Sequence, residues 1–306
     1  MKKILIIHYS QTGQLTDIVN SITAPLKKIE DVCIVYEEIK PRPGFDFPWS
    51  ATKFCDVFPE SVEGIPCEIE PVHFDPNEAY DLVILAYQVW FLAPSLPITA
   101  FLDSSDAKVM KGRPVLTIIG CRNMWLLAHE TVKQKIVESG GRLFGNIVLG
   151  DKTGNLLGVL TITIWMLSGK KKSFLGILPD AGISDQDIYD ASKFGDIVSD
   201  AVKNNDPGPV QNRLNAHGAV TVVPQYILFE KRIHRIFKVW SRFILKKGKR
   251  GNPGRKFRVR LFLVYLFIAI AVIAPVSTVL SMLAVRLKKD EIQNAIGYFS
   301  ENTFLF

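Results

Sequence analysis

The sequence predicts a doubly wound α/β domain built on a five-stranded parallel sheet. Short runs of β-branched and aliphatic residues alternate with amphipathic helical patterns, and the first run passes directly into a loop of hydroxyls and glycine. A composition of 48% hydrophobic and 22% charged residues in 306 residues is typical of a chain with a packed core. Disordered and fibrous classes are therefore excluded.

Five runs fit buried parallel strands, because each is short, apolar and bounded by polar residues. They are residues 3–7, 32–39, 80–86, 113–119 and 143–149. Apolar residues at helical spacing predict helices at 15–26, 96–102, 126–138 and 185–203.

Two insertions interrupt this plan, at 41–76 and 151–184. The first holds seven prolines where a crossing helix would normally lie. It is expected to be a long irregular lid or binding loop. The second contains the apolar stretch 155–169, which we expect either to dip into a membrane, to roof an apolar pocket or to pack in the core.

Charge is divided unevenly along the chain. Residues 1–203 carry 20 Lys and Arg against 25 Asp and Glu, whereas residues 204–306 carry 17 against 5. Such a basic segment indicates contact with an anionic surface, either nucleic acid or a membrane leaflet. Residues 261–285 contain no charge, and about 20 apolar residues suffice to span a bilayer, so we expect a membrane contact and no nucleic acid.

The predicted organisation places four parts after a domain at 1–203. They are a linker at 204–224, a basic amphipathic segment at 225–260, a hydrophobic membrane segment at 261–285 and a tail at 286–306. Thirteen Lys and Arg without an acid between Lys231 and Arg260 place the domain on the cytoplasmic face of the membrane. The short apolar run after Lys3 does not fit a secretory signal.

Aromatic and aliphatic residues recur at helical spacing between basic ones in 225–247. This helix is expected either to lie in the headgroup plane or to pack on the domain. Residues 246–260 are predicted to be a solvated basic linker. The segment 261–285 is expected to span, to re-enter or to pack on the domain.

The four cysteines do not form a metal or disulfide framework in the sequence. Cys33, Cys55, Cys67 and Cys121 are widely spaced, without a C-x-x-C pair and without a nearby histidine. We therefore expect no metal.

The loop after the first strand has the composition of an anion site. In a doubly wound sheet, ligands bind beyond the carboxyl ends of the strands. Ser10, Thr12 and Gly13 bring hydroxyls and backbone N–H groups to a helix N-terminus, where the dipole favours a phosphate. The loop lacks the Walker and Rossmann glycine patterns. The alternative is an ordinary helix start with Ser10 or Thr12 as N-cap.

The run I-I-H-Y-S-Q-T-G-Q-L-T resembles the first loop of the flavodoxin-like flavoprotein superfamily, and the resemblance covers residues 1–203. It implies FMN as cofactor, with its phosphate held by Ser10, Gln11, Thr12, Gly13 and Gln14. Where the family often has a second threonine, this chain has Leu15, which cannot donate a hydrogen bond. The resemblance therefore implies a reduced affinity for the phosphate.

The second and third loops resemble segments of flavodoxin-like quinone and FMN oxidoreductases that pass the isoalloxazine ring. The resemblance implies a ring border made of Gln88, Val89, Trp90, Phe91, Gly120, Cys121 and Arg122. Trp90 or Phe91 is expected to stack on the ring, or else both are core aromatics at a strand end. Arg122 is expected either to stabilise negative charge on reduced flavin or a substrate enolate, or to pair with a surface carboxylate.

Four further motifs resemble the dialkylresorcinol condensing enzymes, bacterial proteins that work beside a ketosynthase. The motifs are F-D-F-P-W, F-x-x-x-F-P-E-S-V, N-L-L with I-T-I-W-M-L-S-G-K-K, and L-P-D-A-G-I-S-D-Q-D-I. The resemblance implies a flavin-dependent aromatase that oxidises a hydrophobic alkylated cyclohexanedione to a dialkylresorcinol, with a ketosynthase partner. Its catalytic base is unassigned, and the candidates by loop position are His8, Tyr87 and His129, with Arg122 as a further catalytic candidate that stabilises negative charge.

Two other functions stay open at this point. A membrane-tethered quinone reductase or electron carrier would bind FMN without needing a ketosynthase product. A flavin-free membrane scaffold would bind a partner enzyme instead. Leu15 favours the scaffold, and the aromatic second loop disfavours it.

Overall fold

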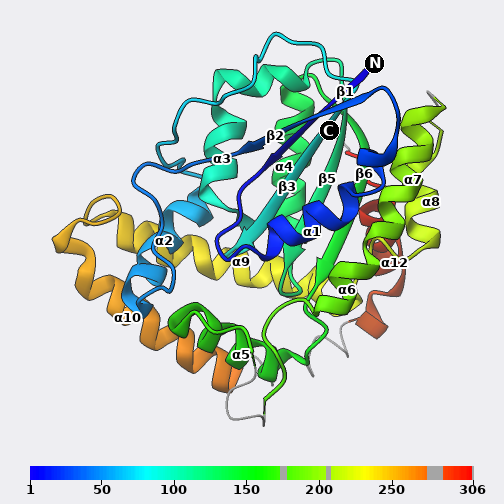
Figure 1. Ribbon diagram of the computed structural model, residues 1–306. Coiled ribbons are helices and arrows are strands. Elements are labelled where there is room, and N and C mark those ends of the chain that lie inside the picture. The colour runs from blue at the N-terminus through cyan, green and yellow to red at the C-terminus, as the bar shows by residue number, and fades with distance from the viewer. Residues whose placement is uncertain (173–177, 205–207, 274–284, 305–306) are drawn as a thin grey trace.

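A computed structural model describes residues 1–172, 178–204, 208–273 and 285–304. Five parallel strands lie in the order β2-β1-β3-β5-β6, and the two-residue β4 (Ala93–Pro94) pairs antiparallel with the end of β3 (Figure 1). The parallel strands are β1 (Lys2–His8), β2 (Val32–Glu38), β3 (Leu82–Trp90), β5 (Pro114–Cys121) and β6 (Arg142–Gly150). The predicted parallel α/β sheet is confirmed, and β4 adds a sixth, very short strand.

Helices cover both faces of the sheet. Because strand side chains alternate between faces, Ile4 and Ile6 pack toward one layer, and Leu5 and Ile7 toward the other. The first layer holds α1 (Gln14–Thr23), α6 (Asp185–Asp190), α7 (Ser192–Lys203) and α8 (Val210–Ala216). The second holds α3 (Leu96–Asp103), α4 (Leu126–Glu138) and α12 (Lys289–Ser300).

The predicted single helix over 185–203 is two helices. They meet at Ala191, whose N–H bonds to the carbonyl of Ile188, three residues back instead of four. The second of them, α7, packs tightly on α1, since a Cβ at Gly195 would lie 1.9 Å from the carbonyl oxygen of Ile22.

The insertion 41–76 is not an irregular loop throughout. Its centre forms α2 (Ala51–Glu63), which begins where Ser50 Oγ accepts a hydrogen bond from the N–H of Lys53 and ends at Gly64, with φ +66°. Cys55 and Phe58 are fully buried on one face of this helix. The expectation was wrong here because one of the seven prolines, Pro59, lies inside this helix instead of breaking it.

The stretch predicted to be a linker, 204–224, is part of the fold in its described residues. Val210 and Leu214 of α8 are buried against the sheet. The N–H of Val148 donates to the carbonyl of Ala219 at 2.8 Å, which attaches the chain to the edge strand β6.

α9 (Pro224–Leu245) and α10 (Lys256–Ile268) pack around α2. The ring of Phe58 stacks on the ring of Phe262 of α10, with 3.8 Å between ring centroids. It meets the ring of Phe237 of α9 edge-on, with 5.0 Å between centroids. The aromatic face of α9 therefore lies against protein, as in the alternative of a helix packed on the domain.

The basic stretch 246–260 is not a solvated linker. Arg255 is fully buried, and its guanidinium binds Asp56 Oδ1 and Glu60 Oε1 of α2, each at 2.6 Å. The prediction failed because the two carboxylates that hold this arginine lie almost 200 residues earlier in the chain.

The predicted membrane segment 261–285 begins inside α10 and continues through a π-helical turn, η4 (Ala269–Ile273). Its residues 274–284 lie outside the described part of the chain. Among the described residues, no helix combines the length and apolar character needed to cross a membrane. In the tail, α12 packs on the domain, with Ile292 and Phe299 buried in its core.

Candidate functional site

The loops after β1 and β3 meet where the strand order reverses between these two strands. The N–H of Gln11 donates to Gln88 Oε1 at 3.2 Å, which joins the loop after β1 to the end of β3. Gly13 begins α1 with φ +86°, and no atom lies within 4 Å of the place where its Cβ would stand. The N-cap residue Gly13 has no side chain to cap this helix, and the positive end of the helix dipole lies at this open position.

Two predicted phosphate ligands use their side chains to hold the loop. Gln11 Nε2 donates to the carbonyls of Phe45 at 3.3 Å and Asp46 at 3.0 Å. Gln14 donates to the carbonyl of Ile183 at 3.0 Å and accepts from its N–H at 3.2 Å. Both side chains therefore tie the loop to the insertions.

The remaining residues of this loop differ in their availability. Ser10 Oγ is only a distant acceptor for the N–H of Thr16, at 3.4 Å, so its hydroxyl is available. Thr12 is half-buried and precedes the open Gly13. Leu15 is buried in the core under α1 and faces no ligand.

The end of β3 separates the two predicted stacking aromatics. Trp90 makes edge-on contacts with Tyr9 at 5.9 Å and Phe45 at 5.1 Å, next to the first loop. Phe91 instead packs on Phe54 and Phe58 of α2. Of the two, Trp90 therefore borders the crevice.

The backbone turns sharply after Trp90. Phe91 and Leu92 have φ of +51° and +67°, a left-handed conformation that costs side-chain-bearing residues about 1–3 kcal/mol each. Such strain is typical of binding loops. Half-buried Gln88 and Val89 precede this turn.

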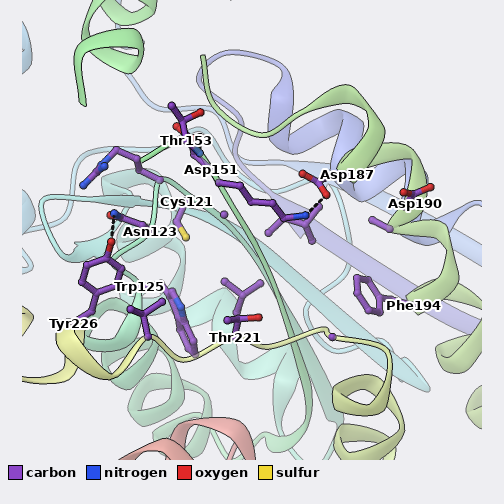
Figure 2. A pocket seen from close by; sticks show the side chains of 18 of the residues that line it. Cys121, Asn123, Trp125, Asp151, Thr153, Asp187, Asp190, Phe194, Thr221 and Tyr226 are labelled. Atoms are coloured by element: carbon purple, nitrogen blue, oxygen red, sulfur yellow. Dashed lines mark hydrogen bonds and ion pairs between the residues drawn. The ribbon is translucent and has the colours of Figure 1, made fainter. Parts of the chain in front are cut away.

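A cavity of about 660 Å³ lies beside the third loop, at the carboxyl ends of β5 and β6. Figure 2 shows Cys121, Asn123 and Tyr226 on one side of it and Asp187 and Phe194 on the other. Its size is that of small-molecule sites. Of the predicted site residues, Cys121 and Arg122 line it. Gly120 lies below, where a Cβ would approach Leu15 Cδ1 to 3.1 Å.

Asp151 brings a buried carboxylate to this cavity. It follows β6 and is 7% exposed, and its Oδ1 accepts from the N–H of Thr153 at 2.8 Å. Its Oδ2 is buried without a hydrogen-bond partner. A Cβ on Gly158 of α5 (Asn155–Ser168) would lie 3.2 Å from this oxygen and 3.5 Å from Arg122 Nη1. Asp151 was not among the residues predicted from the sequence, although its position at a strand end was a signal that could have found it.

Arg122 lies partly buried beside this carboxylate, and burial lowers the pKa of its guanidinium. The Asp151 side chain counteracts that effect through its charge. Near it, Asn123 Nδ2 donates to the hydroxyl of Tyr226 at 2.7 Å, which fixes one wall of the cavity.

The N-terminus of α4 is capped from a distant element. The carboxylate of Glu230 on α9 accepts from the N–H groups of Leu126 at 3.2 Å and Leu127 at 2.9 Å. Burial raises the pKa of Glu230 to about 7. This helix end is therefore occupied by the chain's own acid.

Two of the predicted catalytic candidates are fully buried and bound to each other. Tyr87 Oη lies 3.0 Å from His129 Nδ1, and His129 Nε2 lies 2.9 Å from Asn302 Oδ1. Burial raises the pKa of Tyr87 and lowers that of His129 to about 3. Neither residue lines the cavity, so both support the core beneath it.

His8 and Cys121 also have pKa values shifted by burial. His8 ends β1 and is 5% exposed, and burial lowers the pKa of its imidazole. Burial raises the pKa of the Cys121 thiol, so it stays protonated at neutral pH. Among the described residues, no three His, Cys, Asp or Glu side chains gather as metal ligands.

No protein-family model matches the chain, and no curated protein matches it. Solved structures do match. A flavoprotein from Lactobacillus acidophilus, in complex with FMN, is 23% identical over 48% of this chain and 93% of its own, with a TM-score of 0.36. A flavodoxin from the domain Archaea is 12% identical over 66% and 99%, with a TM-score of 0.34.

Two-electron reduced flavodoxin from Megasphaera elsdenii is 18% identical over 50% of this chain and 89% of its own, with a TM-score of 0.29. At TM-scores below 0.5 these likenesses do not define the class of the protein. The class follows instead from its own strand order. Counted over the parallel strands, that order is 2-1-3-4-5, which defines a doubly wound α/β protein with its switch point between β1 and β3.

Proposed function

We propose that the protein is an FMN-dependent oxidoreductase that holds the FMN phosphate in the loop from Ser10 to Gln14. The observation that carries this proposal is the open N-terminus of α1 at Gly13, at the β1/β3 switch point. Flavodoxin, which has this strand order, binds FMN at that point. The donor types fit a phosphate, because the loop before this helix N-terminus contains the hydroxyls of Ser10 and Thr12 and the backbone N–H of Gly13.

The ring would lie between Trp90 and the loop from Gly120 to Arg122. When bound, FMN supplies the acceptor for a hydride. Trp90 would orient the ring, because its edge contacts with Tyr9 and Phe45 fix its own position.

The cavity beside this loop is proposed as the substrate site. Asp151 Oδ2, a buried acceptor without a partner, would take a proton from a carbon next to a carbonyl. Arg122 would stabilise the enolate oxygen that this step creates. Trp125 and Phe194 give the same cavity apolar walls for alkyl groups.

The substrate proposed for this site is an alkylated cyclohexanedione. The motifs that resemble dialkylresorcinol condensing enzymes support it, as does a cavity with both apolar and polar walls. Loss of one proton and one hydride, followed by enolisation, converts such a dione to a dialkylresorcinol. A ketosynthase would supply the dione as the partner enzyme.

The test is anaerobic reduction of bound flavin by a dialkylcyclohexane-1,3-dione. The loss of the visible flavin band measures the rate of this reduction. We expect Asp151→Asn to slow bleaching by roughly 10²–10⁴-fold with FMN affinity unchanged. Asp196→Asn, a change of the same kind at an exposed position that does not line the cavity, should leave both unchanged. Bound flavin that no dione bleaches would refute the aromatase and favour an electron carrier.

A further inference from the structure

α10 is apolar on two opposite faces. Its inner face buries Val259 and Phe262 against α2 and α9. Its outer face exposes a stripe that continues into η4. The exposed apolar residues are Phe257, Leu261, Val264, Phe267, Ile268 and Val272, and both phenylalanines are 74% exposed. A surface helix in water normally has a polar outer face, so this stripe requires a covering environment.

α5 exposes a second apolar stripe. Leu157, Leu160 and Leu167 are between 43% and 49% exposed, at spacings that place them on one helical face, while Trp165 is buried on the other. Figure 1 shows α5 and α10 at the same end of the molecule, beyond the carboxyl ends of the strands. Gly154, the residue directly before α5, lines the cavity.

Cations border both stripes. Neither α5 nor α10 contains an acidic residue, and the whole stretch 231–260 has none. Exposed basic side chains lie before α10 (Lys246, Lys247 and Lys249), in its first turns (Lys256 and Arg260) and after α5 (Lys170 and Lys172). The surface therefore combines exposed apolar groups with excess positive charge, as amphipathic helices at anionic lipid surfaces do.

We propose that the outer stripes of α5 and α10 form a membrane-docking surface that lies in the interface of a bilayer containing anionic lipid. Anionic lipid complements the basic border, whereas a second copy of this chain would bring like charges together. The aromatic face of α9 is not the contact, because it packs on α2. This surface is independent of flavin, and it would place the cavity near a lipid pool.

The test is flotation of the full chain with vesicles of phosphatidylcholine alone and of phosphatidylcholine mixed with phosphatidylglycerol. We expect strong binding to the mixed vesicles and weak binding to the neutral ones. Val264→Asp with Phe267→Asp should lower binding to the mixed vesicles by roughly a hundredfold, since each buried side chain contributes about tenfold or more. The matched control is Tyr189→Asp on α6, 74% exposed on another helix, which should bind like the wild type.

The electrostatic contribution to vesicle binding is tested with separate variants. Lys247→Glu with Lys249→Glu should weaken binding to the mixed vesicles by roughly fivefold per lysine and leave binding to neutral vesicles unchanged. In the Phe267→Trp variant, lipids brominated on the acyl chain should quench more of the tryptophan fluorescence than they do in the wild type. Unchanged circular dichroism melts show that each variant folds.

Two results would overturn the proposal. In the first, the Val264 and Phe267 double variant floats as well as the wild type. In the second, the wild type sediments as a dimer that the double variant breaks, without binding vesicles, which would assign the surface to a second copy of the chain.

Discussion

Two buried ionisable side chains at α4 have pKa values shifted in opposite directions. Burial raises the pKa of Glu230 from 4.5 to about 7 and lowers that of His129 from 6.5 to about 3. Between pH 4.5 and 6.5 the folded state keeps a proton on Glu230 that the unfolded chain has lost. Over the same interval the unfolded chain binds a proton on His129 that the folded state lacks. As pH rises, the free energy of unfolding therefore falls through Glu230 and rises through His129, each by about 1.4 kcal/mol per pH unit.

The opposing contributions of Glu230 and His129 to the free energy of unfolding should therefore largely cancel in the wild type across that interval. Glu230→Gln removes the group whose contribution falls as pH rises, so the stability of this variant should rise with pH. His129→Gln removes the opposite slope, so its stability should fall with pH. Urea denaturation at a series of pH values measures both. Glu30→Gln, an exposed control, should follow the wild type, and a Glu230→Gln profile parallel to the wild type would contradict the assignment.

At the residue scale, sequence patterns located the first loop but not its neighbours. Ser10 to Gly13 follow a strand and precede a helix, so their position was visible locally. Glu230 caps a helix about 100 residues away, and no local pattern marks such a pairing. The availability of Asp151 Oδ2 depends on Gly158 in another element, which only packing reveals.

The packing of α7 on α1 depends on one missing side chain. A Cβ on Gly195 would meet backbone atoms of Ile22, which cannot rotate away. Gly195→Ala should therefore lower the free energy of unfolding by about 3 kcal/mol. Gly297→Ala in α12 has no atom within 4 Å and should raise it by about 0.5–1 kcal/mol. The urea denaturation midpoints of the two variants measure these changes in stability. Equal changes would contradict the close contact between α7 and α1.

At the element scale, the strands were predictable because buried parallel strands have a local signature. α2 was not, since the prolines around it dominate the pattern of 41–76. The basic stretch before α10 has the composition of a solvated linker. Arg255 is nevertheless buried there, because Asp56 and Glu60 of α2 bind its guanidinium. Such ion pairs between distant elements leave no periodic trace.

The domain predicted at 1–203 depends on residues from the last third of the chain. Ile227, Ile292 and Phe299 belong to the core of the second layer. Removing three such side chains costs about 6 kcal/mol or more, which is comparable to the total stability of a domain. A fragment of residues 1–203 should therefore be unfolded or aggregated, as circular dichroism and sedimentation will show. A monomeric fragment that melts near the full chain would contradict this.

At the scale of the whole molecule, charge asymmetry predicted a separate basic tail, and packing produced an integrated one. A count of charges does not say which face carries them, and here the basic residues border helices that also pack on the domain. The parallel sheet and the location of the first loop were predictable. The cavity was not, because its walls come from four separate stretches of chain.

The central claim is tested most directly by titrating the purified full chain with FMN and with riboflavin and recording the visible spectrum and flavin fluorescence. The first loop provides phosphate donors, so FMN should bind saturably and riboflavin, which lacks the phosphate, roughly tenfold or more weakly. Equal affinity for the two flavins would contradict a phosphate site at the start of α1. A folded chain that binds neither would contradict the flavin function itself.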